Sequence, residues 1–522
     1  MRDFHLPGRS TVHALNGMCA TSHPLAASTA VDVLRAGGNA ADAAIAAAVL
    51  LGLCEPQMTG IGGDCFALVK PAGSEEVVAL NGSGRAPAGA DIEALRGAGH
   101  EAVPLGGVEA VTVPGAIDAF CRLSERFGTR PLAELLAPAI RYAEEGIPVA
   151  PRTAFDWASG AERLQGAARR HYLLGGEAPR AGQVFRAPGQ AEVLRRVAAE
   201  GRDGFYAGEV MKDMRAALAA LGGSHAADDF AATEASWAEP ISGGYGPVEL
   251  VEHPPNGQGA TAILMGHMAR RLDWHDLPPL SAQRVHIEAE IAKLAYDARD
   301  RLIADGADPT RMLSGDLADA LCALVDPARA QPDPRGRADH VHKETVYLTV
   351  VDRDRMAVSL IYSIFHSFGS GLASERFGIL FQNRGAGFTL EAGHPNGYGP
   401  GKRPMHTIIP AMTRRDGRVD MSFGVMGGAY QPNGHLRVLS NMVDHGMDPQ
   451  EALDAPRAFA GEGRLGVERG YPDEVRAELA AMGHDVHVPD TPIGGAQAIV
   501  IGADGGLTGA SDPRKDGCAL GF

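Results

Sequence analysis

The stretch His342-Lys343-Glu344-Thr345-Val346-Tyr347-Leu348-Thr349-Val350-Val351-Asp352 decides how this chain is organised. Its second half alternates strand-favouring side chains between two faces, which is typical of a buried strand. The residues before it, 326–340, are rich in Pro, Arg and Asp and are typical of a loop. A buried strand that opens with Thr directly after a polar loop predicts a chain that cuts itself between Glu344 and Thr345.

The cut would place two reactive groups on one residue. Thr345 would carry a hydroxyl nucleophile and a free α-amino group, whose ordinary pKa is about 7.7–8.0. Such an amine can accept the proton of the hydroxyl near neutral pH, which activates a weak nucleophile. The alternative is an ordinary Thr in an ordinary strand, and this stretch alone favours that alternative. The rest of the chain argues for the cut.

Composition limits the classes of function. The chain has 522 residues, of which 45% are hydrophobic and 21% charged, as in a large soluble globular protein. Its net charge of −16 argues against nucleic acid or an anionic membrane as the main partner, although a local site can still bind a small anion. No apolar run is long enough for a membrane span, and residues 1–8 show no secretory signal. We therefore expect a cytoplasmic protein.

Helices and strands are both predicted. Residues 24–53, interrupted at 37–39, and residues 281–305 have helical patterns, and the second half of the first segment is apolar nearly all round. After Thr345 strands dominate, at 346–351, 357–363, 378–382 and 419–425. This mixture suits a layered α/β sandwich, but the residues alone do not separate a sandwich from a doubly wound sheet. The Gly-rich run at 60–63 precedes a strand, which excludes a dinucleotide-binding loop.

Several motifs together carry a family resemblance. They are Gly38-Asn39-Ala40-Ala41-Asp42-Ala43, Gly60-Ile61-Gly62-Gly63-Asp64, Val111-Thr112-Val113-Pro114-Gly115, and Thr345 seven residues before Asp352. With them the chain resembles the γ-glutamyltransferases (glutathione hydrolases), which are self-processing N-terminal-nucleophile hydrolases. The resemblance implies an αββα four-layer sandwich built by a large subunit, 1–344, and a small subunit, 345–522, which together form one catalytic unit.

The resemblance also implies roles for residues after the cut. Thr345 is the nucleophile, and Ser363 falls where the family keeps a second hydroxyl that orients it. Gly427 and Gly428 fall where the family has a glycine pair whose N–H groups stabilise the oxyanion, and losing one such donor costs about 10²–10³ in rate. The alternatives are a strand Ser that points elsewhere and a Gly-Gly turn without function.

The substrate pocket departs from the family pattern. The family's carboxylate-binding Arg is replaced by Ser83, with Arg85 two residues further on, and the Asp that receives an α-amino group is replaced by Gly387. Arg384 stands where an amide is usual, and Phe365 replaces an Asn.

Two further positions depart in the same way, because His406 and Thr407 take the places of paired serines. The acylation machinery is thus kept while most of the glutamyl recognition set is missing. Arg384, and to a lesser extent Arg85, could hold a carboxylate through a bidentate fork, or either Arg could form an ordinary surface ion pair. We therefore expect a small carboxylate-bearing amide without an α-amino group. Gln382-Asn383-Arg384-Gly385 and Phe368-Gly369-Ser370-Gly371 resemble the oxamate amidohydrolase branch.

Other expectations complete the prediction. His366 and His406 are candidate substrate donors; no HExxH motif or i,i+4 ligand pair lies near them, so neither a metal nor a cofactor is predicted. Residues 393–402 are either a lid or a passive connection. Two rival functions remain: γ-glutamyl transfer from glutathione, and an uncleaved scaffold or binding protein. Assembly of processed units into a homodimer is left open.

Overall fold

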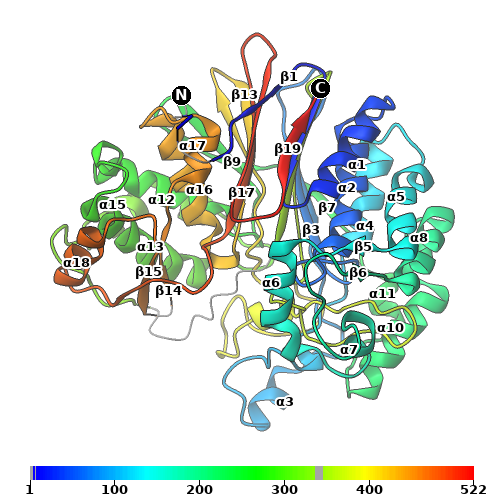
Figure 1. Cartoon of the computed structure of the whole chain (residues 1–522). Helices are drawn as coiled ribbons and strands as arrows, with labels where there is room; N and C mark the ends of the chain where they lie inside the picture. Colours follow the sequence, from blue (N-terminus) through cyan, green and yellow to red (C-terminus); the bar gives the residue numbers. More distant parts are fainter. Residues whose placement is uncertain (1–3, 6–7, 335–344, 462) are drawn as a thin grey trace.

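The computed structural model describes residues 4–5, 8–334, 345–461 and 463–522, and it contains two seven-stranded sheets packed face to face between layers of helices (Figure 1). Glu344 and the rest of 335–344 lie outside the described residues, so the predicted cut can be followed only from its Thr345 side. The two sheets are called sheet 1 and sheet 2 below.

All strand pairs within these two sheets are antiparallel. Sheet 1 contains, in spatial order, β19 (Cys518–Gly521), β2 (Gly17–Thr21), β10 (Val346–Asp352), β11 (Ala357–Ser363), β3 (Asp64–Lys70), β4 (Val78–Gly82) and β7 (Ser236–Ala238). Sheet 2 contains β1 (Val12–Ala14), β18 (Leu507–Ser511), β17 (Gly495–Ile501), β13 (Arg418–Met426), β12 (Ala411–Arg415), β9 (Val248–Glu252) and β8 (Ile241–Tyr245).

Helices cover the outer face of each sheet (Figure 1). On the side of sheet 1 lie α1 (Pro24–Arg35), α2 (Ala40–Cys54), α4 (Ala116–Phe127), α5 (Leu132–Glu145), α8 (Pro188–Glu200), α9 (Asp203–Tyr206), α10 (Gly208–Ala220) and α11 (Ala227–Ala231). On the side of sheet 2 lie α12 (Gly259–Arg271), α13 (Ala282–Leu302), α14 (Thr310–Leu313), α15 (Gly315–Cys322), α16 (Gln431–Val443), α17 (Pro449–Asp454) and α18 (Asp473–Ala481).

Smaller elements lie at the periphery. They are α3 (Ile92–Gly97), α6 (Pro151–Gly160) and α7 (Gly166–Tyr172), the pair β5 (Ile147–Pro148) and β6 (Val184–Phe185), and a three-stranded sheet of β14 (Ala458–Gly461), β15 (Arg464–Val467) and β16 (Val486–His487). Single 3₁₀ turns occur at Val108–Ala110, Ala161–Arg163, Trp274–Asp276, Arg384–Gly387 and Gly428–Tyr430. The αββα arrangement implied by the family resemblance is confirmed.

Alternation along β10 joins the layers. Leu348 and Val350 pack into the core on the helix side of sheet 1, whereas Tyr347 and Thr349 face sheet 2. The Thr349 hydroxyl lies 2.7 Å from the Ser422 hydroxyl of β13, which links the two sheets directly. Because side chains alternate with a period of two, Thr345 belongs to the face that looks into the space between the sheets.

Helix α2 is buried along its whole length, as its composition predicts. All its residues from Ala40 to Cys54 are buried, and it packs against β10 and β11. Asn39 caps its N-terminus in a capping box with Asp42, and the Asp42 carboxylate also accepts the Thr129 hydroxyl at 2.6 Å. The only charge of this helix is therefore satisfied locally, which allows the helix to lie against the sheet.

One predicted strand is wrong. Residues 378–382 do not join either sheet; Leu380 forms only an isolated bridge with Ala373. Ile379 and Phe381 are nevertheless fully buried and contribute to the helix-side core of sheet 1. A short apolar run has the same pattern in a buried loop as in a buried strand, because burial, not strand pairing, selects its residues.

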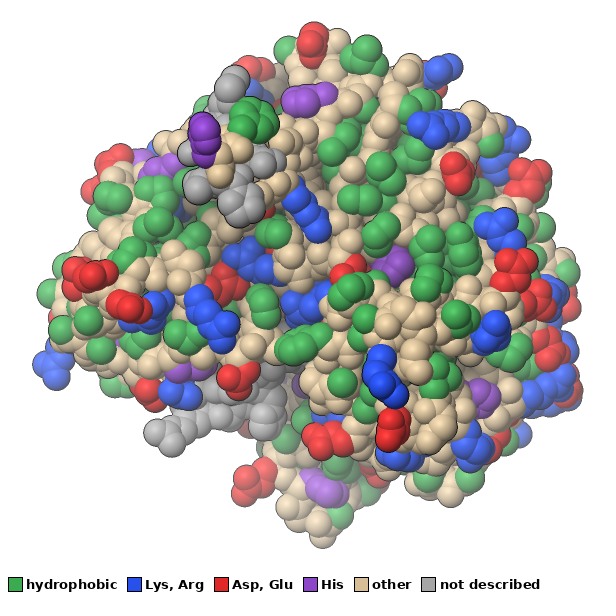
Figure 2. All heavy atoms as spheres, in the orientation of Figure 1, with side chains coloured by type: hydrophobic (Ala, Val, Ile, Leu, Met, Phe, Trp, Pro, Cys, Tyr) green, Lys and Arg blue, Asp and Glu red, His purple; other side chains and the backbone are tan. Residues whose placement is uncertain are grey.

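The surface is mixed in charge. Figure 2 shows basic and acidic side chains interspersed over the face drawn there, among small groups of hydrophobic ones. A nucleic-acid-binding face instead carries a clustered basic stripe. Within the described ranges, none of the helices combines the length and the apolar composition that a membrane crossing requires.

The contact between β10 and β13 predicts a sensitive glycine. A Cβ at Gly424 of β13 would come within 2.4 Å of the buried Tyr347 ring. We expect Gly424→Ala to destabilise the protein by about 1–3 kcal/mol, because the ring has to shift in a packed interior. Gly244 of β8, in the same sheet, has open space where its Cβ would go. Gly244→Ala is the matched control and should leave the thermal midpoint close to the wild-type value; equal midpoints for both variants would contradict the packing argument.

Candidate active site

Strand register lines up three polar side chains. Val346 of β10 lies opposite Tyr362 of β11, so the next pair along the ladder is Thr345 and Ser363. Ser363 in turn lies opposite Asp64, the first residue of β3. Thr345, Ser363 and Asp64 therefore form one row across sheet 1, and all three are fully buried.

Ser363 is the centre of a hydrogen-bond network. Its Oγ accepts a bond from the Thr345 hydroxyl at 3.4 Å, from the Phe365 N–H at 2.9 Å and from Arg384 Nη2 at 3.2 Å. Phe365 has a φ of +80°, a left-handed conformation that is rare for a bulky residue. This conformation aims the Phe365 N–H at Ser363, so local backbone strain helps to position the hydroxyl beside Thr345.

Arg384 is a buried cation. Its Nη1 donates to the Thr407 hydroxyl at 2.9 Å, and its guanidinium lies 4.0 Å from the Phe365 ring centroid. Burial lowers the pKa of Arg384 to about 9, against the opposing effect of Asp64. Among the described residues no carboxylate oxygen lies within 4.0 Å of this guanidinium. The side chain thus remains cationic near neutral pH without a direct carboxylate partner.

Asp64 supplies the opposite charge at longer range. Its carboxylate accepts bonds from the N–H groups of Gly84 and Gly115 and from the Gln382 side chain at 2.8 Å. Burial raises the pKa of Asp64 to about 6, while Arg384 and these donors act in the lowering direction.

His406 is a further buried polar residue and lies next to Asp64. Its Nδ1 accepts the Ile408 N–H at 3.3 Å, so the ring is neutral and its Nε2–H donates to Asp64 at 3.1 Å. Burial, with Arg384 nearby, lowers the pKa of His406 well below its ordinary value. His406 is thereby fixed to Asp64 and orients the chain at Thr407, which contacts Arg384.

The predicted oxyanion glycines lie at the end of β13. Gly427 and Gly428 have φ values of +121° and +58°, which explains why glycine occupies both positions. Gln258 fixes this turn, because its Nε2 donates to the Gly428 carbonyl at 3.1 Å and to the Thr407 carbonyl at 2.7 Å. The turn is therefore held at a set position relative to the residues that contact Arg384.

A sequence profile described as gamma-glutamyltranspeptidase matches residues 26–522. The chain belongs to the γ-glutamyltranspeptidase family. It is 36% identical to the oxamate amidohydrolase proenzyme of Klebsiella pneumoniae, over 97% of this chain and 98% of that protein. It is 34% identical to the glutathione hydrolase-like YwrD proenzyme of Bacillus subtilis, over 97% and 98%.

A solved structure extends the match to the fold. The crystal structure of cephalosporin acylase from Bacillus halodurans superposes with a TM-score of 0.91 at 36% identity, covering 100% of this chain and 99% of that one. The chain is thus an enzyme of a family of hydrolases and acyltransferases, and the proenzyme names of its relatives fit a precursor that is processed.

One of the predicted substrate ligands, Arg85, lies apart from this network. Arg85 is exposed and pairs with Asp305 at 2.9 Å, and it also donates to the Gly401 carbonyl. His366 lies at the edge of the network, because it is half-buried, contacts Asn383, and packs its ring against that of Phe365 with 4.4 Å between the centroids. The surface ion pair that the sequence left open for Arg85 is the contact that the structure shows.

The loop 393–402 is hydrogen-bonded to the segment around Ala86. Residues Ala86 and Lys402, and Ala86 and Gly401, are joined by backbone hydrogen bonds of 2.9 and 3.1 Å. The Lys402 ammonium also donates to carbonyls within the loop, at Pro395 and Gly397. These bonds hold the loop closed on itself and against residue 86.

Sequence reasoning missed Asp64 and Gln258. In the sequence, Asp64 stands out only as the last residue of a family motif, and nothing singles out Gln258. A signal existed for Asp64, because a lone carboxylate directly before a wholly apolar strand has to be buried and satisfied there. Gln258 gave no comparable signal, since its partners lie about 150 residues away or more.

The raised pKa of Asp64 predicts a pH-dependent stability. The native carboxyl titrates near 6 and the unfolded one near about 3.9, so the native state binds more protons between these values. The free energy of unfolding therefore falls as pH rises through this window. We expect Asp64→Asn to lose this contribution, whereas Asp473→Asn, at an exposed carboxyl, should keep it. Urea unfolding across the window checks the slope, and identical slopes for wild type and Asp64→Asn would contradict the assignment.

Proposed function

We propose that this enzyme is a self-processing amidohydrolase that cuts itself between Glu344 and Thr345 and then hydrolyses a small carboxylate-bearing amide such as oxamate. The two products of the cut, residues 1–344 and 345–522, form one catalytic unit in this proposal. The observation that carries the choice of substrate is the buried Arg384 cation, two hydrogen bonds from the Thr345 hydroxyl.

Processing uses the same hydroxyl as turnover. The Thr345 Oγ attacks the carbonyl carbon of Glu344, the peptide C–N bond breaks, and the nitrogen of Thr345 gains a proton as an ester forms. Water then hydrolyses the ester, which releases the Glu344 carboxylate and restores the hydroxyl. Ser363, which already accepts the Thr345 hydroxyl at 3.4 Å, holds this oxygen in position for the attack.

Turnover repeats the attack on an external amide. The Thr345 hydroxyl adds to the substrate carbonyl while the new α-amino group takes its proton and passes it to the leaving ammonia. The N–H groups at Gly427 and Gly428 are the proposed donors to the oxyanion. Water then attacks the acyl-enzyme ester and loses a proton to the same amine, which passes it to the Thr345 oxygen as the ester bond breaks and the carboxylic acid leaves.

The position of Arg384 favours a short acid. Arg384 Nη2 and Thr345 Oγ1 both contact the Ser363 hydroxyl, at 3.2 and 3.4 Å. A carboxylate bound by Arg384 is therefore close to the carbonyl under attack. In oxamate these two groups are directly bonded, whereas in a γ-glutamyl group three carbons separate the carbonyl from the carboxylate. A buried guanidinium that has no carboxylate of the described residues within ion-pair distance is also the expected partner for an anionic substrate.

The relatives of this chain support an amidohydrolase, and they also support one alternative function, the hydrolysis of glutathione. The oxamate amidohydrolase of Klebsiella pneumoniae and the cephalosporin acylase structure share the same identity with this chain, 36%. Hydrolysis of glutathione remains the second candidate, because the glutathione hydrolase-like protein of Bacillus subtilis is 34% identical. Release of ammonia from oxamate, compared with glutamate from glutathione, separates the two.

The proposed cut gives a direct prediction. Denaturing mass spectrometry of wild-type protein should show two chains, the smaller beginning at Thr345, and Thr345→Ala should show one. Thr349→Ala, which alters the same strand but keeps the nucleophile, is the matched control and should still give two chains. A single intact chain from active wild-type protein would rule out this mechanism.

Arg384 gives a prediction about the substrate. We expect Arg384→Met to lower kcat/KM for oxamate by about 10²–10³-fold, because truncating one partner of a buried charge pair costs about 2–5 kcal/mol. Arg384→Lys should retain part of the activity, since an ammonium keeps the charge but lacks the fork. Arg85→Ala is the control and should stay within about threefold of wild type, as expected for an exposed pair.

Each Arg384 variant also has to be checked for self-cleavage. Arg384 also contacts Ser363, so each variant is first tested for two chains by mass spectrometry. Activity is then compared only among processed proteins. Equal kcat/KM values for processed wild type and processed Arg384→Met would contradict the substrate assignment while leaving the self-cleavage proposal intact.

A further inference from the structure

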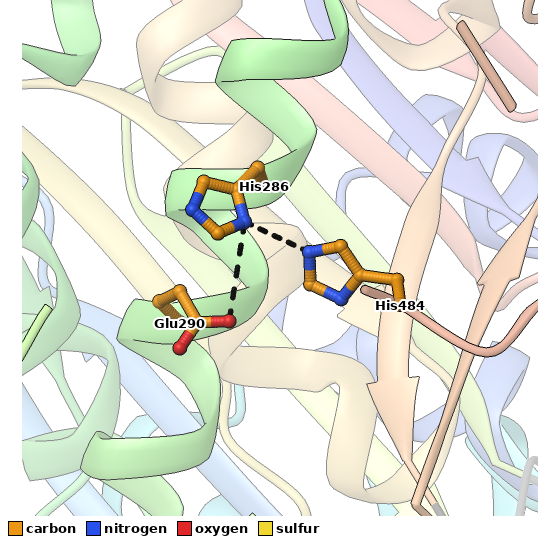
Figure 3. A group of neighbouring side chains, drawn as sticks. All are labelled: His286, Glu290 and His484. Atoms are coloured by element: carbon orange, nitrogen blue, oxygen red, sulfur yellow. Dashed lines mark hydrogen bonds and ion pairs between the residues drawn. The ribbon is translucent and has the colours of Figure 1, made fainter. Parts of the chain in front are cut away.

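Three ligand-type side chains converge at a place remote in sequence from the Thr345 network. His286 and Glu290 project from one face of α13, a turn apart, toward His484 in the segment after α18 (Figure 3). One ligand atom from each lies within 4.8 Å of the others. His286 and Glu290 are buried, and His484 is half-buried. His286 and Glu290 are an i,i+4 pair far in sequence from His366 and His406, near which no metal is predicted.

The hydrogen bonds of His286 leave one ring nitrogen facing the cluster. Its Nε2 lies 2.8 Å from the carbonyl oxygen of Asp326, and a carbonyl only accepts, so Nε2 carries the proton. The lone pair is therefore on Nδ1, which accepts the His484 Nε2–H at 2.8 Å and lies 4.0 Å from the Glu290 carboxylate. A metal bound between the two rings would take the place of this proton, with His484 in its other tautomer. A histidine whose second nitrogen donates to a carbonyl is the arrangement usual for metal ligands, because that bond fixes the ring.

The cluster is also accessible from one side. His484 borders a cavity of about 500 Å³, which is also lined by Lys293, Asp326 and Gln331.

The Lys293 ammonium already contacts Glu290, so a metal ion would compete with it for this carboxylate. Its ammonium lies 2.6 Å from Glu290 Oε1 and donates to the Gln331 carbonyl. Because Lys293 lines the same cavity, its side chain has room to turn away when another cation takes this oxygen. Lys293 is thus expected to weaken metal binding without blocking it.

We propose that His286 Nδ1, His484 Nε2 and Glu290 Oε1 form a binding site for a divalent transition metal of the zinc type, with a fourth position open to the cavity. Two imidazoles and one carboxylate are typical zinc ligands, whereas Ca²⁺ and Mg²⁺ prefer all-oxygen sites. In a tetrahedral zinc site the donor atoms lie about 3.3 Å apart. The two nitrogens are 2.8 Å apart, the carboxylate oxygen is 4.0 Å from His286 Nδ1, and all three atoms lie within 4.8 Å of one another, so side-chain shifts of about 1 Å bring them to this spacing.

Such a metal would join the two sides of the proposed cut. His286 and Glu290 come before Thr345 and His484 comes after it. The His286–Asp326 bond, and the bond from the Gln331 N–H to Glu290 at 3.3 Å, attach the last described part of the first segment to the same cluster. Metal binding would therefore hold the two chains together near the end of the first one, and would stabilise the native assembly by mass action.

The test uses metal alone with the purified, chelator-treated enzyme. Titration with Co²⁺, followed by its visible absorption, should show one equivalent bound with the intensity of four-coordinate nitrogen and oxygen ligation. Zn²⁺ should displace it and raise the thermal midpoint. His484→Ala should lose both effects, since it removes a ligand at a half-buried position. His275→Ala is the matched control, because His275 belongs to the more exposed cluster with Asp273 and Asp276, and it should bind like wild type.

A second variant keeps the proposal testable if His484→Ala fails to fold. Lys293→Met removes the competing ammonium, so it should bind Zn²⁺ at least about tenfold more tightly, equivalent to 1.4 kcal/mol. Absence of Co²⁺ binding to the wild type, unchanged binding in folded His484→Ala, loss of binding in His275→Ala, or an unchanged affinity in Lys293→Met would each overturn the proposal.

Discussion

Antiparallel pairing of β10 with β11, and of β11 with β3, is the constraint on which the site depends. This register places Thr345, Ser363 and Asp64 side by side and turns all three toward the second sheet. A slip of one residue would point Thr345 at the helix layer instead. The buried core on both faces of sheet 1 prevents this slip, so the packing that stabilises the fold also fixes the direction of the nucleophile.

Electrostatics inside this row follow from burial. Asp64 and Arg384 are both fully buried, yet they do not form a direct ion pair. The pKa of Asp64 is raised and that of Arg384 is lowered, because each group has lost water and, among the described residues, has no close partner of opposite charge. The Arg384 guanidinium instead donates hydrogen bonds to the neutral hydroxyls of Ser363 and Thr407. In the proposed reaction, this unpaired cation is the group that attracts an anionic substrate.

Both sheets mix strands from the two sides of Thr345. In sheet 1, β10 lies between β2 and β11 and β11 lies next to β3, so strands from before and after Thr345 share hydrogen-bonded ladders. A cut at Thr345 would therefore leave two chains with a common core rather than two domains. The histidine cluster between α13 and the segment after α18 is a second such junction, on the helix layer of sheet 2.

The sequence by itself determined the local features: the buried strand that begins after Thr345, the direction of its alternating side chains, the wholly buried helix α2, and the family. These follow from short-range periodicity and motifs, which do not need the rest of the chain. Only the tertiary structure shows that Asp64 lies beside His406 and that Gln258 is hydrogen-bonded to the glycine turn. It also shows that Arg85 is at the surface and that residues 378–382 do not join a sheet. Those outcomes depend on which distant segments meet, and because every such contact is decided by the packing of whole layers, no local pattern records it.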